Sequence, residues 1–473
     1  MMKGLTLRDL AAACGVRCDN DTAFTGNVVT DSRRVLPGDV FVALRGTQVD
    51  GHDFLDAVEK AGAVAAIVER TVTHCRLLQW EVTDAVQALG ALAAINRQRF
   101  SGPVIGLTGS AGKTTTKEMI AAILRCAGSP LVTEGNLNNH LGVPMTLLRL
   151  SDEHDSAVIE MGASALGEIR YLTQQVKPNV ALVTTVAPAH IEGFGSIDNV
   201  AVGKAEIFEG LAANGVAIVN ADNAWTREWV ARLQRQYRVV TYSAADSNAC
   251  AVNVFASDVQ VTAAGLQFVL HANGSQAPVL LRFLGLHNVG NAVAAAASCL
   301  AVGISLSQVV SGLAEAMPYK GRLQLHSGVA GSVVIDDTYN ANPASVAMAV
   351  DALLTVAAAQ RVLVLGDMAE LGDASEALHE AVGQQAKMAG VKTLLACGDQ
   401  SQATVRGFGE GARHFSDWQT LAAACGALAA VGVVFLIKGS RSAGMERVVA
   451  ALLPPASDVT ILDGVSEGRV QAC

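Results

Sequence analysis

The chain has 473 residues and a formal net charge of −9, with 51% hydrophobic and 16% charged residues. This length is typical of about three domains. An acidic balance without a basic run argues against non-specific nucleic-acid binding, so we expect no nucleic-acid partner. The longest apolar run, residues 292–304, is shorter than the roughly 20 residues that a membrane-spanning helix needs, so no transmembrane segment is predicted.

The first residues lack the apolar stretch of a secretory signal. The nine cysteines are odd in number and scattered, which is typical of reduced thiols. We therefore expect a cytoplasmic protein, and we expect it to be a monomer.

Residues 1–98 predict a small α/β domain. An alternating apolar run at 40–44 and a buried segment at 61–68 read as strands. A helical stretch at 80–100 leads into the next domain, which we place at residues 99–318.

That second domain opens with a strand, a glycine loop and a helix. The apolar run 104–107 precedes the loop, and a helix-like segment follows at 117–126. The spacing is G-x-x-G-K-T, because position 107 is leucine where the longer phosphate-binding pattern has glycine. Such a loop directs backbone N–H groups, a lysine and a hydroxyl at nucleotide phosphates and Mg²⁺. An alternative is a glycine turn with an exposed lysine, which the flanking elements disfavour. The candidate residues are Gly109, Ser110, Ala111, Gly112, Lys113, Thr114 and Thr115.

Further buried strands at 157–160, 180–184 and 216–220 predict a parallel sheet covered on both faces. Residues 249–284 predict a small antiparallel insertion. Glu160 ends a strand, where a carboxylate can hold Mg²⁺ or simply be solvated. Taken alone, His190 reads as a loop histidine and Lys204 as an exposed lysine.

Asn288 and Asn291 open an alanine-rich helix one turn apart, so their amides face the same way. They either cap the helix or read a purine edge.

The third domain, residues 319–473, contains four predicted strands at 333–335, 362–365, 394–396 and 433–437. Each strand ends in polar or glycine residues. Because ligands of open α/β sheets bind beyond the carboxyl ends of the strands, we expect this edge to bind a ligand. Residues 336–343 form a polar loop that either binds a ligand or caps the next helix.

Taken together, these stretches resemble the Mur ligase family, the ATP-dependent amide-forming enzymes of peptidoglycan precursor synthesis, over essentially the whole chain. The resemblance rests on the glycine loop and on residues 135–139, 336–343, 366–372 and 438–446. It implies an α/β fold of three domains: an N-terminal UDP-substrate domain, a central P-loop ATPase domain with a parallel sheet, and a C-terminal Rossmann-like domain for an incoming dipeptide. The same stretches imply addition of D-alanyl-D-alanine to UDP-N-acetylmuramoyl-tripeptide through an acyl phosphate.

The resemblance also implies residue roles. Lys113, His190 and Lys204 would be catalytic, and two Mg²⁺ ions would bind to Thr114 with Glu160 and to His190 with Lys204. The family's matching lysine is carbamylated, which would make Lys204 a carboxylate-like ligand. ATP would also contact Asn288, Asn291, Arg322 and Asp337. The implied substrate-binding residues are Asp31, Ser32, Arg33, Gly46 and Asp50 on the UDP side, with Asn136, Asn138, Asn139, Tyr339, Asn340, Asn342, Ser440 and Arg441.

One position departs from the family pattern. An arginine is expected directly before His287, and this chain has Leu286, so one expected ATP contact is absent. Three alternatives stay open: another Mur ligase, a folylpolyglutamate synthase-like amide ligase, and a nucleotide-dependent switch or transport ATPase. The last-domain motifs argue against the first two, and the lack of a guanine-reading Asn-Lys-x-Asp argues against the third. The third residue of the acceptor tripeptide, diaminopimelate or lysine, is left undecided.

Overall fold

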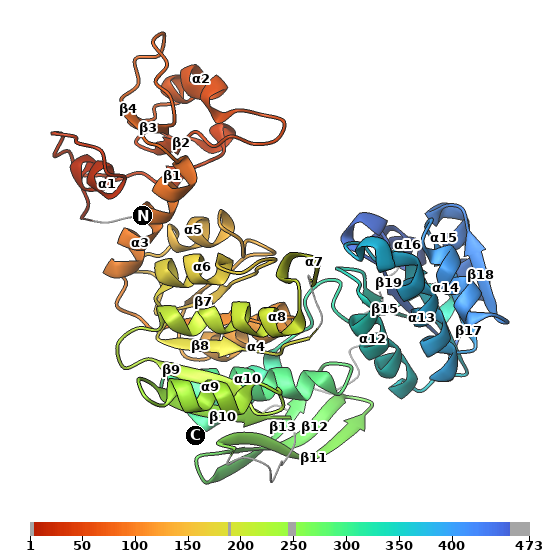
Figure 1. Cartoon of the computed structure of the whole chain (residues 1–473). Coiled ribbons are helices and arrows are strands. Elements are labelled where there is room, and N and C mark those ends of the chain that lie inside the picture. The colour runs from red at the N-terminus through yellow and green to blue at the C-terminus, as the bar shows by residue number, and fades with distance from the viewer. Residues whose placement is uncertain (1–3, 188–190, 245–251, 455–473) are drawn as a thin grey trace, which may run out of the picture. The chain divides into compact units, whose positions relative to one another are not determined.

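A computed structural model describes residues 4–187, 191–244 and 252–454. The chain forms two compact units, Met1–Pro318 and Tyr319–Cys473. The described residues of these units form three sheets, of four, nine and six strands (Figure 1). The predicted α/β class is confirmed. In the described ranges, no helix is both long enough and apolar enough to span a membrane.

The four-stranded sheet lies in the N-terminal part of the first unit, and all its strand pairs are parallel. Its central strands are buried because their side chains are apolar on both faces. In sheet order, the strands are β1 (Val28–Val29), β2 (Val40–Val42), β3 (Ala65–Val68) and β4 (Gln79–Glu81). The helices of this part are α1 (Leu7–Ala13), η1 (Ser32–Arg34), η2 (Gly51–Phe54), α2 (Leu55–Lys60) and α3 (Ala85–Arg99).

Helix α3 joins this small sheet to the central one (Figure 1). Its N-cap is Asp84, whose carboxylate accepts the N–H groups of Val86 and Gln87 in the first turn. Near its end, Asn96 donates to the carbonyl oxygens of Leu147 and Leu150 at 2.8 and 3.0 Å. Arg97 donates to the carbonyl oxygen of Val176 at 2.7 Å. Buried polar bonds therefore fix α3 against the central part.

The central sheet has nine strands in the order β13-β12-β11-β10-β9-β8-β5-β7-β6. The strands are β5 (Val104–Thr108), β6 (Pro130–Val132), β7 (Ser156–Glu160), β8 (Val180–Val183), β9 (Val216–Asn220), β10 (Arg238–Ser243), β11 (Val254–Thr262), β12 (Gly265–Ala272) and β13 (Ser275–Leu281). The segment predicted as an antiparallel insertion is not separate. Its first strand, β11, pairs parallel with β10, and β12 and β13 then extend the same sheet in antiparallel pairs.

Helices cover both faces of the central sheet, as the buried strands predict. One apolar core lies under α4, α10 and α11, and another lies under α3, α6 and the segment from α8 to α9. The helices of this part are α4 (Lys113–Arg125), α5 (Gly142–Leu147), α6 (Glu168–Val176), α7 (Ile191–Phe194), α8 (Ile197–Ala205), η3 (Glu206–Gly210), α9 (Thr226–Leu233), α10 (His287–Ala301) and α11 (Leu306–Glu315).

The second unit contains a six-stranded sheet in the order β14-β15-β19-β16-β17-β18. The strands are β14 (Gln324–Ser327), β15 (Val333–Asp337), β16 (Gln360–Gly366), β17 (Thr393–Cys397), β18 (Ala412–Phe415) and β19 (Val433–Lys438). The sequence predicts the four central strands and misses β14 and β18. Both are edge strands with mixed polar composition, so neither contains an apolar run.

The last strand, β19, lies between β15 and β16. The carboxyl ends of these parallel strands are therefore neighbours, although they are far apart in sequence. The helices of this unit are η4 (Val329–Gly331), α12 (Pro343–Thr355), η5 (Gly372–Ala374), α13 (Ser375–Met388), α14 (Ser401–Phe408), α15 (Trp418–Leu428), η6 (Arg441–Ala443) and α16 (Glu446–Leu452).

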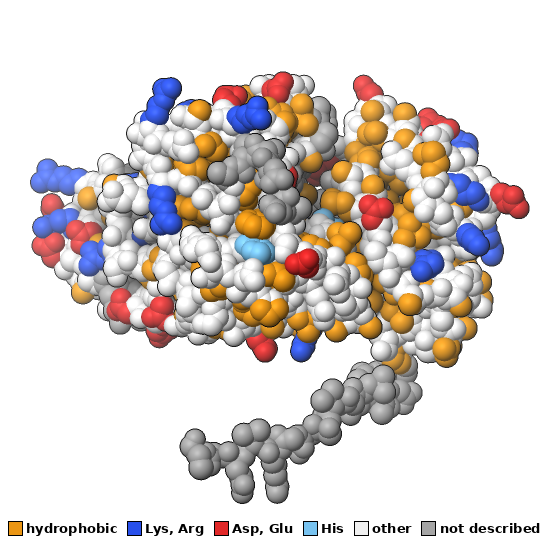
Figure 2. Space-filling view, turned by 90° about the horizontal axis from the view of Figure 1, so that it is seen from below, with side chains coloured by type: hydrophobic (Ala, Val, Ile, Leu, Met, Phe, Trp, Pro, Cys, Tyr) orange, Lys and Arg blue, Asp and Glu red, His pale blue; other side chains and the backbone are white. Residues whose placement is uncertain are grey.

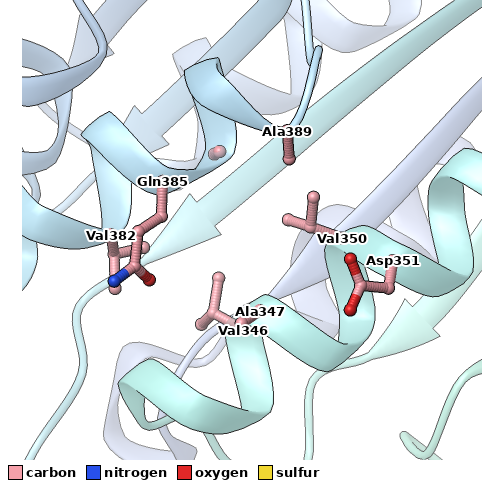
Figure 3. A pocket seen from close by; sticks show the side chains of 8 residues that line it. Val346, Ala347, Val350, Asp351, Val382, Gln385 and Ala389 are labelled. Atoms are coloured by element: carbon pink, nitrogen blue, oxygen red, sulfur yellow. The ribbon is translucent and has the colours of Figure 1, made fainter.

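A small hollow of about 50 Å³ lies between α12 and α13. Val346, Val350 and Val382 line it together with Asp351 and Gln385 (Figure 3). Ligand pockets typically enclose about 300 Å³ or more, so this hollow is too small for a nucleotide.

The charged side chains visible in Figure 2 are scattered, and acidic and basic groups are mixed. On that face, no large basic patch appears among the coloured residues. The distribution is that of an ordinary solvated surface.

Candidate active site

The glycine loop between β5 and α4 folds back over the start of its helix. The Nζ of Lys113 donates to the carbonyl oxygen of Gly109 at 2.8 Å. The hydroxyl of Thr184, just beyond β8, donates to the carbonyl oxygen of Ala111 at 2.6 Å. Ser110 also bonds to the chain beyond β8 through its N–H and its hydroxyl. The loop is thus held at the carboxyl edge of the sheet, where the helix N-terminus favours phosphate.

Two glycines of this loop are required by close neighbours. A Cβ at Gly109 would lie 2.0 Å from Oγ1 of Thr184, and one at Gly112 would lie 2.3 Å from Oδ1 of Asn291. Gly112 also has a φ of 78°, in the left-handed region. The next residues, Thr114 and Thr115, lie in the first turn of α4, with Thr114 buried.

Glu160 is positioned to bind a cation. It is the last residue of β7 and only 1% exposed. Its Oε1 accepts the Nδ2–H of Asn138 at 2.8 Å. Its Oε2 is buried and has no hydrogen-bond partner within the described part of the chain. A buried carboxylate oxygen without a donor is costly, and Mg²⁺ prefers such an oxygen as a ligand. The site therefore fits the predicted metal.

Asn138 lies in a loop with two other predicted substrate contacts. The carbonyl oxygen of Asn136 accepts the N–H of Asn138 at 2.7 Å. Oδ1 of Asn139 accepts the N–H of Gly142 at 2.9 Å, at the start of α5. The side chain of Asn139 therefore shapes the loop, and that of Asn138 reaches the carboxylate of Glu160.

Sequence reasoning missed Lys117, a fully buried lysine on α4. Its Nζ donates to the carbonyl oxygen of Thr133 at 2.7 Å. The hydroxyl oxygen of Thr133 in turn accepts the N–H of Glu160 at 3.0 Å. Lys117 thus supports the backbone of Glu160 through Thr133. Lys117 follows Lys113 by one helical turn, and this spacing is the feature of the sequence that places both lysines on the same face of α4.

Lys204 lies on α8 and is buried, so the exposed position expected from the residue alone is wrong. It is 2% exposed, and its Nζ donates to the carbonyl oxygen of Ala163 at 3.2 Å. The same Nζ lies 5.3 Å from the ring centroid of Phe194. Burial, with the added charge of Lys113, lowers the pKa of Lys204 to about 7. Its partner in the predicted metal site, His190, lies outside the described residues.

Asn288 and Asn291 contact each other, as their spacing predicts. The Nδ2 of Asn291 donates to Oδ1 of Asn288 at 2.8 Å, and Oδ1 of Asn291 accepts the hydroxyl of Thr116 at 3.3 Å. This chain of bonds connects the first turn of α10 to the P-loop helix. Leu286, where the resemblance expects arginine, is 54% exposed at the N-cap of α10. An arginine at this position would have room to extend into solvent. The expected ATP contact is therefore missing because the residue is leucine, and not because the fold leaves no space.

The first loop assigned to the UDP side surrounds η1. Asp31 caps this turn by accepting the N–H of Arg33 at 3.0 Å. The carboxylate of Asp31 also holds the guanidinium of Arg33 through bonds of 2.9 and 2.7 Å. Ser32 begins the turn. The side chain of Arg33 is 86% exposed, so solvent and ligands can reach it.

The second loop leads into η2. Asp50 lies 2.6 Å from Nδ1 of His52 and 3.0 Å from the guanidinium of Arg70. The N–H of Gly46 donates to the carbonyl oxygen of Val49 at 2.8 Å. The carboxylate of Asp50 therefore fixes the shape of this loop.

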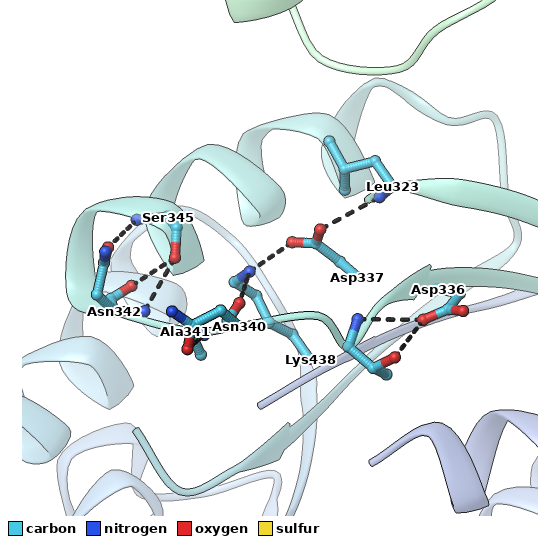
Figure 4. A network of polar contacts seen from close by, with 9 residues as sticks. Leu323, Asp336, Asp337, Asn340, Ala341, Asn342, Ser345 and Lys438 are labelled. Atoms are coloured by element: carbon cyan, nitrogen blue, oxygen red, sulfur yellow. Dashed lines mark hydrogen bonds and ion pairs between the residues drawn. The ribbon is translucent and has the colours of Figure 1, made fainter. Parts of the chain in front are cut away.

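Two predicted ATP residues belong to the second unit. Arg322 lies near the beginning of this unit, and Asp337 is the last residue of β15. The guanidinium of Arg322 lies 4.2 Å from the ring centroid of Tyr339. Nε of Arg322 is buried and has no hydrogen-bond partner among the described residues. Asp337 accepts the N–H of Leu323 at 3.2 Å and the Nζ–H of Lys438 at 2.6 Å (Figure 4). The sequence reasoning did not select Lys438.

The loop after β15 shows the helix capping that was one of its two predicted roles, and its ligand binding stays a prediction. Oδ1 of Asn342 accepts the N–H of Ser345 at 2.8 Å, so this asparagine caps α12. Asn340 presents its carbonyl oxygen to Lys438. At the end of β19, the hydroxyl of Ser440 is buried and bonded to the backbone at β16, and Arg441 is exposed.

Three regions of the chain match known family models. Residues 26–97, 107–299 and 321–441 match the family models described as "Mur ligase family, catalytic domain", "Mur ligase middle domain" and "Mur ligase, glutamate ligase domain". The UDP-N-acetylmuramoyl-tripeptide--D-alanyl-D-alanine ligase of Escherichia coli is 45% identical over 90% of this chain and 93% of its own length.

Solved structures are similar over nearly the whole chain. MurF from Acinetobacter baumannii has a TM-score of 0.85 at 36% identity, covering 93% of this chain and 97% of that one. MurF ligase from Thermotoga maritima, in complex with ADP, has a TM-score of 0.80 at 27% identity, covering 90% and 97%.

Proposed function

The chain belongs to the Mur ligase family, and we propose that it uses ATP to join D-alanyl-D-alanine to UDP-N-acetylmuramoyl-tripeptide. The observation that carries this conclusion is the high identity to the Escherichia coli ligase along nearly its whole length. That relative joins the same two substrates, so the conclusion favours this branch over the other amide ligases and over a nucleotide-driven switch.

The reaction has two steps. The terminal carboxylate of the tripeptide attacks the γ-phosphorus of ATP, ADP leaves, and an acyl phosphate forms. The amine of the dipeptide then attacks the acyl carbon, phosphate leaves, and the nitrogen gives up a proton. Most of the catalysis in such transfers comes from positioning and charge stabilisation.

The glycine loop supplies these effects for the phosphates. Ser110 uses its N–H to hold the loop, and the N–H groups at the start of α4 serve the phosphates, while Lys113 neutralises charge on the transferring group. Asn288 and Asn291 of the first unit, with Arg322 and Asp337 of the second, hold the rest of ATP. The buried Nε of Arg322, which lacks a partner among the described residues, supports its place in this set.

Two Mg²⁺ ions complete the site in this proposal. Thr114 and Glu160 hold one, and His190 with a carbamylated Lys204 holds the other. When bound, the ions neutralise charge on the phosphate oxygens. The unpartnered Oε2 of Glu160 supports the first assignment.

The buried amine of Lys204 supports the second metal assignment. A neutral amine can attack CO₂, forming an N–C bond and losing a proton, which converts a cation into a carboxylate. Because its pKa is lowered to about 7, roughly half of Lys204 is neutral at pH 7.

The substrates divide between the two units. The loops at Asp31–Arg33 and Gly46–Asp50 bind the UDP end, and Asn136, Asn138 and Asn139 lie beside the reacting groups. Tyr339, Asn340, Asn342, Ser440 and Arg441 orient the peptide substrates. The three domains of the proposal end near residues 98, 318 and 473.

Phosphate release tests this function. We expect release only when ATP, UDP-N-acetylmuramoyl-tripeptide and D-alanyl-D-alanine are all present, with one ligated product formed for each phosphate. Lys113→Ala should lower the rate by at least about a hundredfold while the circular dichroism spectrum stays unchanged. Turnover of ATP without either peptide substrate would instead identify a switch or transport ATPase.

A further inference from the structure

One buried ammonium connects three segments of the second unit. Lys438 and Asp337 are the last residues of β19 and β15, and they are direct partners in the parallel pairing of these strands. Nζ of Lys438 donates to Oδ2 of Asp337 at 2.6 Å and to the carbonyl oxygen of Asn340 at 2.8 Å (Figure 4). The two side chains are only 2% and 10% exposed. Lys438 therefore fixes both the strand end and the loop after it.

The other oxygen of Asp337 holds the segment that begins the unit. Oδ1 accepts the N–H of Leu323 at 3.2 Å, and Leu323 has a φ of 51°. A branched residue in this left-handed region is strained and needs support from its surroundings. The neighbouring Arg322 packs its guanidinium over Tyr339. The position of Asp337 is thus coupled to that of Arg322.

Asp337 keeps acceptor capacity after these bonds are made. An ionised carboxylate offers about four lone-pair positions, and the N–H of Leu323 and the ammonium of Lys438 use two. The remaining positions suit donors on a ligand, such as the two neighbouring hydroxyls of a ribose.

We propose that Lys438 is a positioning residue for the nucleotide: it holds Asp337 and the loop at Asn340 in the geometry that accepts the ribose hydroxyls of ATP. Lys438 acts through Asp337 and does not contact the substrate. This inference rests on the proposed function, because that proposal assigns Asp337 to ATP.

A double-mutant cycle on the full chain tests it. ADP binding in the presence of Mg²⁺ is measured by calorimetry for the parent, Lys438→Met, Asp337→Asn and the double variant. We expect each single variant to bind ADP about tenfold more weakly, the size expected for loss of a charge-assisted hydrogen bond. The double variant should bind within about twofold of Asp337→Asn, because residues that act as one unit are not additive.

Lys387→Met is the matched control. Lys387 lies on α13 of the same unit and donates to the backbone of Glu410. This variant should keep the parent affinity for ADP. If Lys438→Met fails to fold, Lys438→Arg replaces it, since the larger guanidinium retains the charge and moves it. Weaker ADP binding at an unchanged melting temperature is then expected.

Three outcomes would overturn the inference, and they separate its failure from that of the ATP assignment. A Lys438 variant that melts earlier and binds ADP normally would make the role purely structural. Additive losses in the double variant would mean that Lys438 contacts the nucleotide itself. Unchanged ADP binding in Asp337→Asn would place the error in the assignment of Asp337 to ATP.

Discussion

Three lysines of this chain, Lys117, Lys204 and Lys438, are buried almost completely, and each donates to a backbone carbonyl oxygen. Burying an ammonium is costly, so it persists where it is paired or where it can become neutral. Lys438 is paired with Asp337. Lys204 has a lowered pKa, so it can become neutral. Lys438 is therefore held by a charge partner, whereas the lowered pKa of Lys204 allows its amine to lose a proton near neutral pH.

The carbamylation proposed for Lys204 predicts a pH dependence. Burial lowers its folded-state pKa from 10.5 to about 7, so the neutral fraction rises from about one tenth at pH 6 to about nine tenths at pH 8. We expect the carbamate signal from ¹³CO₂ in NMR to grow over this range. Lys204→Ala should lose the signal and most activity, and added formate should restore part of the activity. A fully active Lys204→Ala would refute the carbamate.

The same shift affects stability. Between pH 7 and 10.5, the unfolded chain binds more protons at Lys204 than the folded chain does. Burial of this lysine therefore lowers the free energy of unfolding by its full amount below pH 7. The free energy of unfolding then rises as the pH increases toward 10.5.

At the level of elements, the P-loop helix is fixed by the start of α10. Asn288 bonds to Asn291, and Asn291 bonds to Thr116 of α4. The glycine at the N-cap of α4 lets this asparagine approach the loop. Two helices that are remote in sequence thus shape the glycine loop at 109–114.

This contact predicts the effect of a methyl group at Gly112. Gly112→Ala would place a Cβ 2.3 Å from Oδ1 of Asn291 at a φ of 78°, so one of the two elements must move. We expect a loss of about 1–3 kcal/mol in unfolding free energy and weaker ADP binding by calorimetry.

Gly290→Ala is a suitable control on α10. Its Cβ would meet only the side chain of Ala244, at 3.5 Å, an ordinary contact. Because alanine favours a helix interior over glycine, stability should be equal or higher and ADP binding unchanged. Equal losses in the two variants would contradict the proposed contact.

At the level of the whole molecule, the proposed function requires that the chain binds a nucleotide. Nucleotide binding to the native chain must therefore stabilise it against unfolding. At a concentration of Mg²⁺–ADP one hundred times the dissociation constant, we expect a gain of about 2.7 kcal/mol. Differential scanning calorimetry measures it, with Mg²⁺ alone as the control. Lys113→Ala should reduce the gain at the same concentration, and an equal gain would argue against the P-loop assignment.

The sequence predicted those parts of the site that are encoded locally. Each of these parts lies within one short segment of the chain. One is the glycine spacing at 109–114 with its flanking strand and helix, and the others are the polar residues that follow Asp336, Gly366 and Lys438. Their backbone conformations follow from residue type and from the pattern of apolar side chains. For the same reason, the four central strands of the last sheet were predictable from apolar runs, and the mixed edge strands β14 and β18 were not.

The sequence by itself therefore determined the class of fold, the phosphate-binding loop and the family. Tertiary structure alone decided which lysines are buried, that β11–β13 extend the main sheet, and that Asp337 meets a lysine 101 residues away. The physical reason is that burial and charge pairing depend on the whole chain's packing. Strand β19 enters between β15 and β16, and only that order brings the ammonium of Lys438 to the carboxylate of Asp337.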